Sequence, residues 1–342
     1  MKISDYNYDL PEDKIALQPV KIRGTSNLLV LHKKSGAIED KKYSDIVDYL
    51  QNGDVLVLND TKVIKARLNV TKQNGAKREL IILEKHGIND DWHTHKIMYR
   101  RKLAVGDVLT VGKATITVNK ILGDGLAIVQ SSMDLLDVAE QYGSVPLPPY
   151  IHRDVKESDT ERYQTVWAKE QGSVAAPTAS LNMTDDTLAN LQSKGIHVVY
   201  ATLHVGLGTF MPIRTDNVED HVMHKEYFEL PKETIATIQT AKRNNHRVVA
   251  LGTTITRTLE YCHSQIMQQK PGDVTGEADI FMYPGYKFKI VDALLTNFHA
   301  PKSTVLMLAA AFARWPNLKQ AYEHAVESNY KFLSYGDSML II

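Results

Sequence analysis

Short apolar runs separated by glycine, asparagine and aspartate dominate the chain between residues 53 and 128. The runs are rich in β-branched residues and leucine, which is typical of strands. They read VLVL, ELIIL, HKIMY, DVLTV, ATITV and GLAIV. Runs of this length at this spacing predict a small antiparallel barrel or sandwich. We expect a helix at about residues 133–142 to follow, and then a stiff, proline-rich VPLPPY segment.

After Tyr150 the pattern changes to strands that alternate with longer helical segments. TDDTLANLQSKG runs into HVVYATLHVG, ETIATIQTAKRNN runs into RVVALG, and FKIVDALLTNF runs into STVLMLAAAFARW. This alternation predicts an α/β fold with a mainly parallel sheet and flanking helices. The N-terminal LLVL and VLVLND add strands to the sheet. We therefore expect a discontinuous α/β catalytic domain, residues 1–60 plus 150–342, interrupted by an inserted antiparallel β-barrel domain at residues 61–149.

Composition indicates an ordinary globular protein. The chain has 342 residues, of which 43% are hydrophobic and 23% charged, which argues against a disordered or fibrous protein. A single cysteine, Cys262, cannot form an internal disulfide. The N-terminal MKISDYNYDLPEDK lacks the basic start and apolar stretch of a signal peptide. The apolar run at residues 305–312 is too short to span a bilayer, so we expect a cytoplasmic protein without a membrane partner.

The charge of the chain is balanced overall but not locally. With 40 basic and 40 acidic residues the formal net charge is zero, so the whole surface does not attract nucleic acid. Basic residues nevertheless gather in one stretch: Lys62, Lys65, Arg67, Lys72, Lys77, Arg78, Arg100, Arg101 and Lys102. A solvated lysine-rich surface and an RNA-binding patch both explain this stretch.

Polar or glycine-rich residues follow several predicted strands. In open α/β sheets, ligands bind at the carboxyl ends of the strands. The residues that follow these strands are Asn59, Asp60 and Thr61; Gly206, Gly208 and Thr209; Gly252, Thr253 and Thr254; and Lys302 and Ser303. We expect these loops to form a single ligand-binding cavity.

Two of these loops stand where a helix is expected to begin. Free backbone N–H groups and the helix dipole at Gly252, Thr253 and Thr254 favour an anion such as a carboxylate or a phosphate. Capping of the helix by a threonine explains the same residues. Ser303 has the same two interpretations, and Lys302 beside it is the more suggestive residue.

Nicotinamide and metal chemistry are poorly supported. HVGLGTF lacks the full G-x-G-x-x-G spacing, and the preceding His204 would be unusual in a dinucleotide site. His221 and His224 with Glu226 have a spacing that suits zinc on a helix, but no cysteine or further histidine cluster completes the ligand set. We therefore expect no metal ion.

Two segments combine aromatic rings with hydrogen-bonding side chains. ERYQTVWA contributes Tyr163 and Thr165, which suit stacking on, and hydrogen bonding to, a base or ribose. DIFMYPGYKF contributes Asp279, Tyr283 and Tyr286 around a Pro-Gly turn. An exposed helix face and packing in the core explain the two segments without a ligand.

Taken in order, these segments resemble the S-adenosylmethionine:tRNA ribosyltransferase-isomerases of queuosine biosynthesis along nearly the whole chain. The matching stretches are YDLPEDKIA, LLVL, VLVLNDTKVIKARL, VPLPPYI, ERYQTVWAKE, AAPTA, TLHVGLGTF, HVMHKEYF, GTTITRTLE, DIFMYPGYKFKIVDALLTNFHAPKSTVLML and YGDSMLII. The resemblance implies a transferase-isomerase that moves the ribosyl part of S-adenosylmethionine onto 7-aminomethyl-7-deazaguanine in tRNA. Epoxyqueuosine forms, and adenine and methionine leave.

The resemblance also implies partners and residue roles. S-adenosylmethionine is the ribosyl-donor substrate, no cofactor is tightly bound, and the anticodon arm of tRNA is the partner of an expected monomer. Asp60, His204 and His299 are candidates for proton transfer because each stands at a predicted strand end within a matching motif. Lys302 and Arg257 suit the methionine carboxylate or a tRNA phosphate. The further substrate-binding candidates in these motifs are Asn59, Thr61, Arg67, Tyr163, Thr165, Pro177, Thr178, Asn182, Gly206, Gly208, Thr209, His221, His224, Gly252, Thr253, Thr254, Asp279, Tyr283, Tyr286, Asn297 and Ser303.

One loop departs from the family pattern. Where relatives usually carry Pro-Thr-Ala-Gly-Leu-His-Phe-Thr, this chain has PTASLNMT, which places Ser180, Asn182 and Met183 at the changed positions. Asparagine does not titrate near neutral pH as histidine does. Two alternatives therefore stay open: a divergent paralogue that acts on another acceptor, and a non-catalytic RNA-binding relative.

Overall fold

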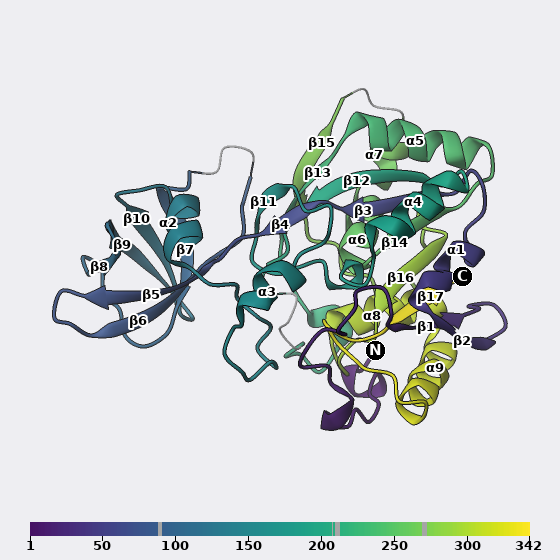
Figure 1. Cartoon of the computed structure of the whole chain (residues 1–342), viewed down its shortest axis with the longest axis horizontal. Coiled ribbons are helices and arrows are strands. Elements are labelled where there is room, and N and C mark those ends of the chain that lie inside the picture. The colour runs from purple at the N-terminus through teal and green to yellow at the C-terminus, as the bar shows by residue number, and fades with distance from the viewer. Residues whose placement is uncertain (88–90, 207, 209–212, 269–271) are drawn as a thin grey trace.

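The computed structural model of the chain has two lobes, a small barrel and a larger lobe of sheet and helices (Figure 1). It describes residues 1–87, 91–206, 208, 213–268 and 272–342. The chain leaves the large lobe after β4 (Thr61–Val63), builds the barrel, and returns after α2 (Leu135–Tyr142). β4 pairs in parallel with β11 (Glu170–Ser173) between the two lobes.

In the described part of the chain, nine strands form the sheet of the large lobe, in the order β15-β13-β12-β3-β14-β16-β17-β1-β2. The central strands β12, β3, β14 and β16 are parallel to one another, and β17 is parallel to β1. The remaining pairs are antiparallel. The strands are β1 Asn27–Leu31, β2 Ile38–Lys42, β3 Val55–Asn59, β12 His197–Leu203, β13 Glu226–Leu230, β14 Val248–Leu251, β15 Val274–Ala278, β16 Ala293–Asn297 and β17 Ser338–Ile341. The sheet is thus mixed, with a parallel centre as expected and antiparallel pairs toward its edges.

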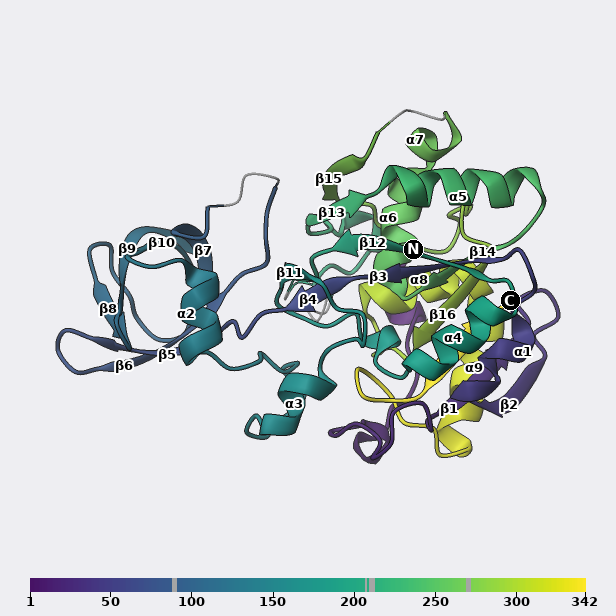
Figure 2. The same ribbon diagram turned by 45° about the horizontal axis from the view of Figure 1, so that its top comes forward.

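The central strands are covered on both faces, which explains their unbroken apolar runs. Every residue of β3, β14 and β16 is buried. On one face Val55 and Val57 pack with α5 (Lys232–Arg243), α6 (Thr253–Tyr261), α8 (Thr304–Ala313) and α9 (Trp315–Glu327). On the other face Leu56 and Leu58 pack with α1 (Ile46–Tyr49) and α4 (Asp185–Ser193) (Figure 2).

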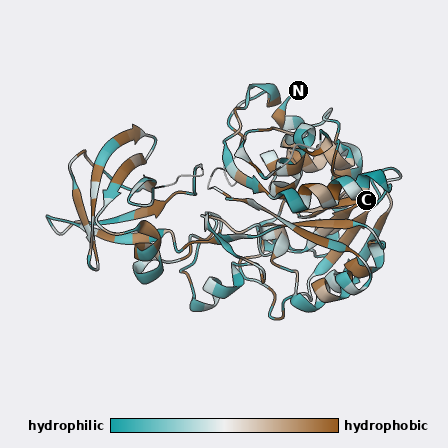
Figure 3. Ribbon diagram, turned by 90° about the horizontal axis from the view of Figure 1, so that it is seen from above, coloured by the Kyte–Doolittle hydropathy of each residue, from teal (hydrophilic) through white to brown (hydrophobic). Residues whose placement is uncertain are grey.

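The small lobe is a closed antiparallel barrel, formed in the described residues by six strands in the order β10-β7-β6-β5-β8-β9. The strands are β5 Arg67–Lys72, β6 Lys77–Ile82, β7 Thr94–Tyr99, β8 Val108–Val111, β9 Ala114–Gly123 and β10 Leu126–Ser131. Alternate side chains, such as Leu68, Leu80 and Val129, fill the interior, and α2 packs against them. Figure 3 shows hydrophobic residues along the strands of both lobes. The predicted α/β fold with an inserted barrel is confirmed.

The barrel strands lie within the range predicted for the inserted domain, residues 61–149, and the exact domain boundaries stay a prediction. Short elements complete the chain: α3 Glu157–Arg162, α7 His263–Met267, and the 3-10 helices η1 Ile3–Asp5, η2 Glu12–Lys14, η3 Tyr43–Asp45, η4 Thr178–Ser180 and η6 Val218–Asp220. Each helix within the described ranges is too short or too polar to span a bilayer.

Candidate active site

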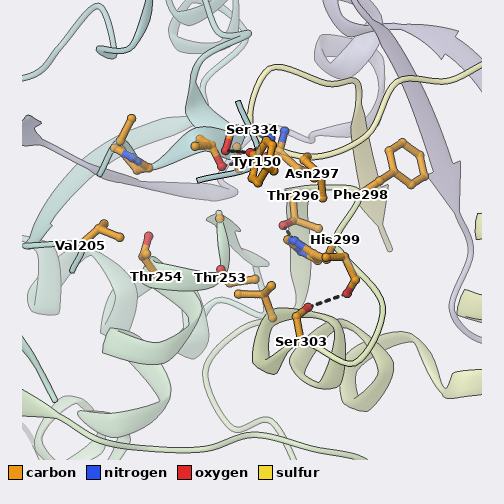
Figure 4. Close-up of a pocket in the computed structure, with 18 residues that line it drawn as sticks. Tyr150, Val205, Thr253, Thr254, Thr296, Asn297, Phe298, His299, Ser303 and Ser334 are labelled. Atoms are coloured by element: carbon orange, nitrogen blue, oxygen red, sulfur yellow. Dashed lines mark hydrogen bonds between the residues drawn. The ribbon is translucent and has the colours of Figure 1, made fainter. Parts of the chain in front are cut away.

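A cavity lies at the carboxyl edge of the central parallel strands (Figure 4). It holds about 770 Å³, including the space at its open mouth. Its walls are formed by Tyr150, residues 176–179, Val205, residues 252–254 and 296–300, Ser303, Val305, Leu333 and Ser334. Because parallel strands present their carboxyl ends at one edge, loops after β12, β14 and β16 meet there. A ligand in this cavity therefore contacts segments that are far apart in the sequence.

One wall of the cavity is the beginning of α6. Gly252 has a φ of 93°, a left-handed conformation that lets the chain turn from β14 into the helix. The first backbone N–H groups of a helix have no partner within it, and Thr253 and Thr254 line the cavity. The hydroxyl of Thr254 is buried and has no hydrogen-bond partner among the described residues. This wall therefore favours an anionic group.

His299 lies on another wall, directly beyond β16. Its Nε2 is 3.0 Å from Oγ1 of Thr296, and its backbone N–H donates to the hydroxyl of Tyr322 at 2.9 Å. The hydroxyl of Tyr8 donates to its backbone carbonyl. Burial lowers the pKa of His299 to about 3. The imidazole is therefore held in place and neutral at physiological pH, and the same burial makes it a weaker base than a free histidine.

Hydrogen bonds also tie the remaining walls together. Oγ1 of Thr178 donates to Oδ1 of Asn297 at 2.9 Å, joining the η4 segment to the end of β16. The hydroxyl of Tyr150 donates to Oγ of Ser334 and accepts from the backbone N–H of Ser334 at 2.9 Å. Apolar groups line the space between these contacts, including Pro177. A mainly apolar cavity with a few fixed polar groups suits a small organic ligand.

The sequence matches one family over its whole length. The family described as queuosine biosynthesis protein matches residues 3–341. An S-adenosylmethionine:tRNA ribosyltransferase-isomerase of Chlorobium phaeobacteroides is 50% identical over 345 residues, and the alignment covers all of both chains. One of Francisella tularensis subsp. novicida is 45% identical with the same coverage. The chain belongs to the S-adenosylmethionine:tRNA ribosyltransferase-isomerase family.

A solved structure agrees with this family membership. The crystal structure of an S-adenosylmethionine tRNA ribosyltransferase from Thermotoga maritima is 32% identical in sequence and has a TM-score of 0.57. The match covers 99% of this chain and 100% of that one. Both lobes therefore belong to the fold of the family.

Of the residues predicted from the sequence, one group lines the cavity. These residues are Pro177, Thr178, Gly252, Thr253, Thr254, Asn297, His299 and Ser303. Ser303 also caps α8: its Oγ donates to the carbonyl of Ala300 at 2.7 Å and accepts from the N–H of Leu306 at 3.2 Å. Ser303 thus caps the helix and also lines the cavity, and binding of an anion by Ser303 stays a prediction.

His204 lies behind the cavity wall and does not line it. Its Nδ1 is 2.8 Å from Oγ1 of Thr61, and its ring stacks on Tyr227 with centroids 6.0 Å apart. Burial, with a smaller contribution from the charge of Lys85, lowers the pKa of His204 to about 3. The next residue, Val205, lines the cavity. In this arrangement His204 supports the wall.

Asp60 lies in a different groove, beside Trp167 and Tyr200. Its carboxylate accepts a hydrogen bond of 2.6 Å from Oγ1 of Thr202, and burial raises its pKa. The neighbouring Asn59 joins strands β3 and β12, because its side chain donates to the carbonyl of Leu203 at 3.0 Å and accepts from the N–H of Leu203 at 3.1 Å. Neither side chain lines the cavity.

Arg257 is buried behind the beginning of α6. Its guanidinium pairs with Glu226 and donates to the carbonyls of His224 at 3.2 Å and Ala278 at 3.1 Å. Arg257 lines a small hollow that shares Thr253 and Thr254 with the cavity. Its charge is therefore already balanced by a carboxylate of the protein.

Several other predicted residues lie outside the cavity wall. Tyr163 and Thr165 are buried, Asp279 and Lys302 are exposed, and the hydroxyl of Tyr286 donates to Glu260 at 3.1 Å. The predicted binding residues outside the wall are Asn59, Thr61, Arg67, Tyr163, Thr165, Asn182, Gly206, Gly208, His221, His224, Arg257, Asp279, Tyr283, Tyr286 and Lys302. Thr209 lies outside the described residues. The roles assigned to all of these residues stay predictions.

Asn182, at the position where relatives usually have histidine, is buried and does not line the cavity. Its Nδ2 donates to the carbonyl of Gly336 at 3.0 Å and lies 3.2 Å from Oγ of Ser338. Met183 is fully buried in the core on the α4 face of the sheet. The changed loop therefore makes structural contacts in this chain.

The sequence did not identify all of the residues that line the cavity. Tyr150, Thr296 and Ser334 were not among the candidates, although Thr296 lies in the same LLTNFH motif as Asn297. Tyr150 and Ser334 are 184 residues apart in the sequence. Only the folded chain reveals that they meet, so no local pattern identifies them as a pair.

Proposed function

We propose that this protein transfers and isomerises the ribosyl moiety of S-adenosylmethionine onto 7-aminomethyl-7-deazaguanine in tRNA. The products are epoxyqueuosine in the tRNA, adenine and methionine. The observation that carries the proposal is the match to the family over residues 3–341, together with relatives of that name that are 50% identical over their full length. S-adenosylmethionine is a substrate here, and the reaction requires no tightly bound cofactor.

The chemistry sets three requirements for the site. The sulfonium of S-adenosylmethionine acidifies the adjacent ribose carbon, so a base that removes this proton starts a rearrangement that expels adenine. A proton donor assists the departure of adenine, and the site excludes water from the intermediates. The mainly apolar walls of the cavity between these loops support the last requirement by limiting contact of a bound ligand with water.

The walls of the cavity suit the parts of S-adenosylmethionine. The methionine carboxylate binds at the beginning of α6, where the N–H groups of Thr253 and Thr254 and the hydroxyl of Thr254 are available. The adenine ring packs against the apolar wall beside Pro177. His299 accepts the proton from the ribose, and we favour it over His204 and Asp60 because it lines the cavity.

The barrel lobe supplies the surface for the anticodon arm. A polar groove between the barrel and residues 147–155 is lined by Arg67, Arg100, His152 and Arg153. Arg67 and Arg100 lie 3.7 Å and 3.4 Å from the carboxylate of Glu79, which neutralises part of their charge. Binding of the RNA backbone in this groove weakens as salt rises. The protein acts as a monomer in the cytoplasm.

The contacts of Asn182 favour this function over a non-catalytic relative. The side chain is hydrogen-bonded to the Gly336 carbonyl and lies 3.2 Å from Oγ of Ser338, so the residue present here has a structural role outside the cavity wall. Activity on a different acceptor base is the second candidate, because the changed loop is continuous with Pro177 and Thr178 in that wall.

The decisive experiment measures adenine release. The purified protein is incubated with S-adenosylmethionine and tRNA that carries the aminomethyl precursor, and adenine is followed by chromatography. We expect adenine in proportion to modified tRNA, and none with tRNA that lacks the precursor base. Adenine release that is independent of the precursor would favour another acceptor. No adenine, while an active relative releases it in parallel, would overturn the proposal.

A further inference from the structure

We infer that Tyr150 is the residue on which the acceptor base of the tRNA stacks when that base enters the cavity. The inference rests on the proposed function and concerns the second substrate of the same site. Tyr150 lines the cavity, and its neighbours in the sequence line the groove that we assign to the RNA. The role of Tyr150 is to bind and orient the base, and its side chain forms no covalent bond in the reaction.

One short segment of the chain borders both the cavity and the groove. Within residues 147–155, Tyr150 lines the cavity and the other residues line the polar groove. Arg67 and Arg100 of the barrel line the same groove from the other lobe. RNA bound in the groove therefore lies against the segment that carries Tyr150. Enzymes that act on a base within folded nucleic acid move that base out of its stack, and here the move leads past this segment.

The backbone around Tyr150 is held in a tight turn. The N–H of Ile151 donates to the carbonyl of Pro148 at 3.0 Å, which leaves Pro149 and Tyr150 at the two central positions of the turn. A proline at the first central position fixes φ at a value that the turn requires. The turn therefore sets the direction of the Tyr150 side chain before any ligand binds.

The hydroxyl of Tyr150 is fixed by a second segment of the large lobe. It donates to Oγ of Ser334 and accepts from the backbone N–H of Ser334 at 2.9 Å (Figure 4). Ser334 lies in the loop before β17 and lines the cavity as well. Because these bonds satisfy the polar tip of the side chain, the ring contributes apolar surface to the cavity. A ring oriented in advance loses little conformational freedom when a base stacks on it.

Packing in the core accounts for one side of Tyr150 and not for its place in the wall. The residue is partly buried against a cluster that includes Ala176, Leu181 and Tyr335. The same side chain also lines the cavity, which is mainly apolar and open at its mouth. Stacking on an aromatic ring suits 7-aminomethyl-7-deazaguanine, since every nucleobase presents a flat π-face.

The methionine end of S-adenosylmethionine uses a different wall. In the proposed complex its carboxylate binds at the beginning of α6, near Thr253 and Thr254. Tyr150 belongs to the chain that returns from the barrel, so it is the wall residue nearest in sequence to the RNA groove. The ribosyl group thus passes from a donor held by the large lobe to a base held beside the segment that joins the two lobes.

The test is a double-mutant cycle between Tyr150 and the acceptor base. Binding of tRNA that carries the aminomethyl precursor, and of the same tRNA with an abasic site at that position, is measured by fluorescence anisotropy for the wild-type protein and for Tyr150→Leu. Stacking of one base on an aromatic ring contributes a factor of about 5 to 150 in affinity. The loss caused by Tyr150→Leu should fall in this range with the precursor base and stay within about twofold with the abasic tRNA.

Two variants serve as controls. Tyr150→Phe keeps the ring, and its affinity for both tRNAs should stay within about threefold of the wild-type protein. Tyr49→Leu is the matched change, because Tyr49 is another partly buried tyrosine whose hydroxyl is hydrogen-bonded, to Glu39 at 2.8 Å, outside the cavity and the groove. Its affinities for both tRNAs should equal those of the wild-type protein. In all three variants, calorimetry should give an affinity for S-adenosylmethionine alone within about twofold of the wild-type value.

Equal losses with the two tRNAs in Tyr150→Leu would overturn the inference. Weaker binding of S-adenosylmethionine in the absence of tRNA would also overturn it, because the adenine ring would then be the group that stacks on Tyr150. If Tyr150→Leu does not fold, the wild-type protein is irradiated with tRNA that carries 4-thiouridine at the acceptor position. A crosslink to Tyr150 or its immediate neighbours is expected, and crosslinks confined to other segments would overturn the inference.

These measurements record binding and not turnover, so they separate the inference from the proposed function. A wild-type protein that shows the coupling but releases no adenine would refute the proposed function and leave the contact between Tyr150 and the base in place. Adenine release without the coupling would refute the role of Tyr150 alone.

Discussion

Thr178 and Asn297 are joined at the cavity wall by a hydrogen bond of 2.9 Å from the hydroxyl of Thr178 to Oδ1 of Asn297. This bond connects the η4 segment to β16, and both residues line the cavity. Thr178→Val should weaken S-adenosylmethionine binding about fivefold to tenfold, since one hydrogen bond contributes about 1 kcal/mol. Isothermal calorimetry measures the change. Thr178→Ser keeps the hydroxyl and should bind like the wild type, and equal losses in both variants would contradict the argument.

Gly252 is required by backbone conformation rather than by space. A Cβ at this position meets only ordinary contacts, with Ala179 at 3.5 Å, but its φ is 93°. Gly252→Ala should reduce the free energy of unfolding by about 1–2 kcal/mol and also weaken S-adenosylmethionine binding. Gly75→Ala is the control, because Gly75 has a φ of 80° in an open barrel turn. It should lower stability in urea without changing affinity.

His299 makes stability depend on pH. Burial lowers its pKa to about 3 in the folded state, whereas an unfolded histidine has a pKa of about 6.5. Between these values the unfolded chain binds the extra proton, so the free energy of unfolding decreases as pH falls from about 6.5 toward 3. In urea titrations, the free energy of unfolding of His299→Asn should decrease less between pH 7.5 and pH 5 than that of the wild-type protein.

The same titrations on the exposed His152→Asn provide the comparison for His299. The urea unfolding curves of His152→Asn should match those of the wild-type protein at pH 7.5 and at pH 5. Burial also lowers the pKa of His204 to about 3. The free energy of unfolding of the His299 variant therefore still depends on pH in part, through His204. An unchanged pH dependence in His299→Asn would show that its imidazole is not neutral and buried in solution.

Asn182 should matter for stability more than for turnover. Asn182→Ala removes the donor to Gly336 and leaves that buried region with unsatisfied polar groups, which costs about 1–3 kcal/mol. The rate of adenine release per folded molecule should stay within about twofold. A large loss of kcat in a variant that remains folded by circular dichroism would place Asn182 in the chemistry after all.

The centre of the sheet follows directly from the sequence, but its edges do not. VLVL and VVAL are apolar without interruption because β3 and β14 are covered on both faces. The direction of β17 does not follow from the sequence. YGDSMLII carries no signal that this strand pairs antiparallel to β16 and parallel to β1. Strand pairing across distant segments is decided by tertiary packing.

The sequence predicted which loops meet at the cavity, but it did not predict what the individual side chains contact. Gly252 and His299 follow strands whose carboxyl ends meet, so topology alone places them together. Tyr283 and Tyr286, whose predicted role in binding stays a prediction, pack on Phe281 and Phe288 with ring centroids 5.3 Å and 5.0 Å apart. Aromatic residues give the same sequence signal in a core as in a binding site.

The position of β17 between β16 and β1 has a consequence for synthesis on the ribosome. β1 emerges early, but among the described strands it is paired with the centre of the sheet through β17, which is translated some 300 residues later. The barrel strands β5 to β10 follow one another in the sequence, so the barrel can close while translation continues. β1 and β2 can therefore join the sheet only after β17 has been translated.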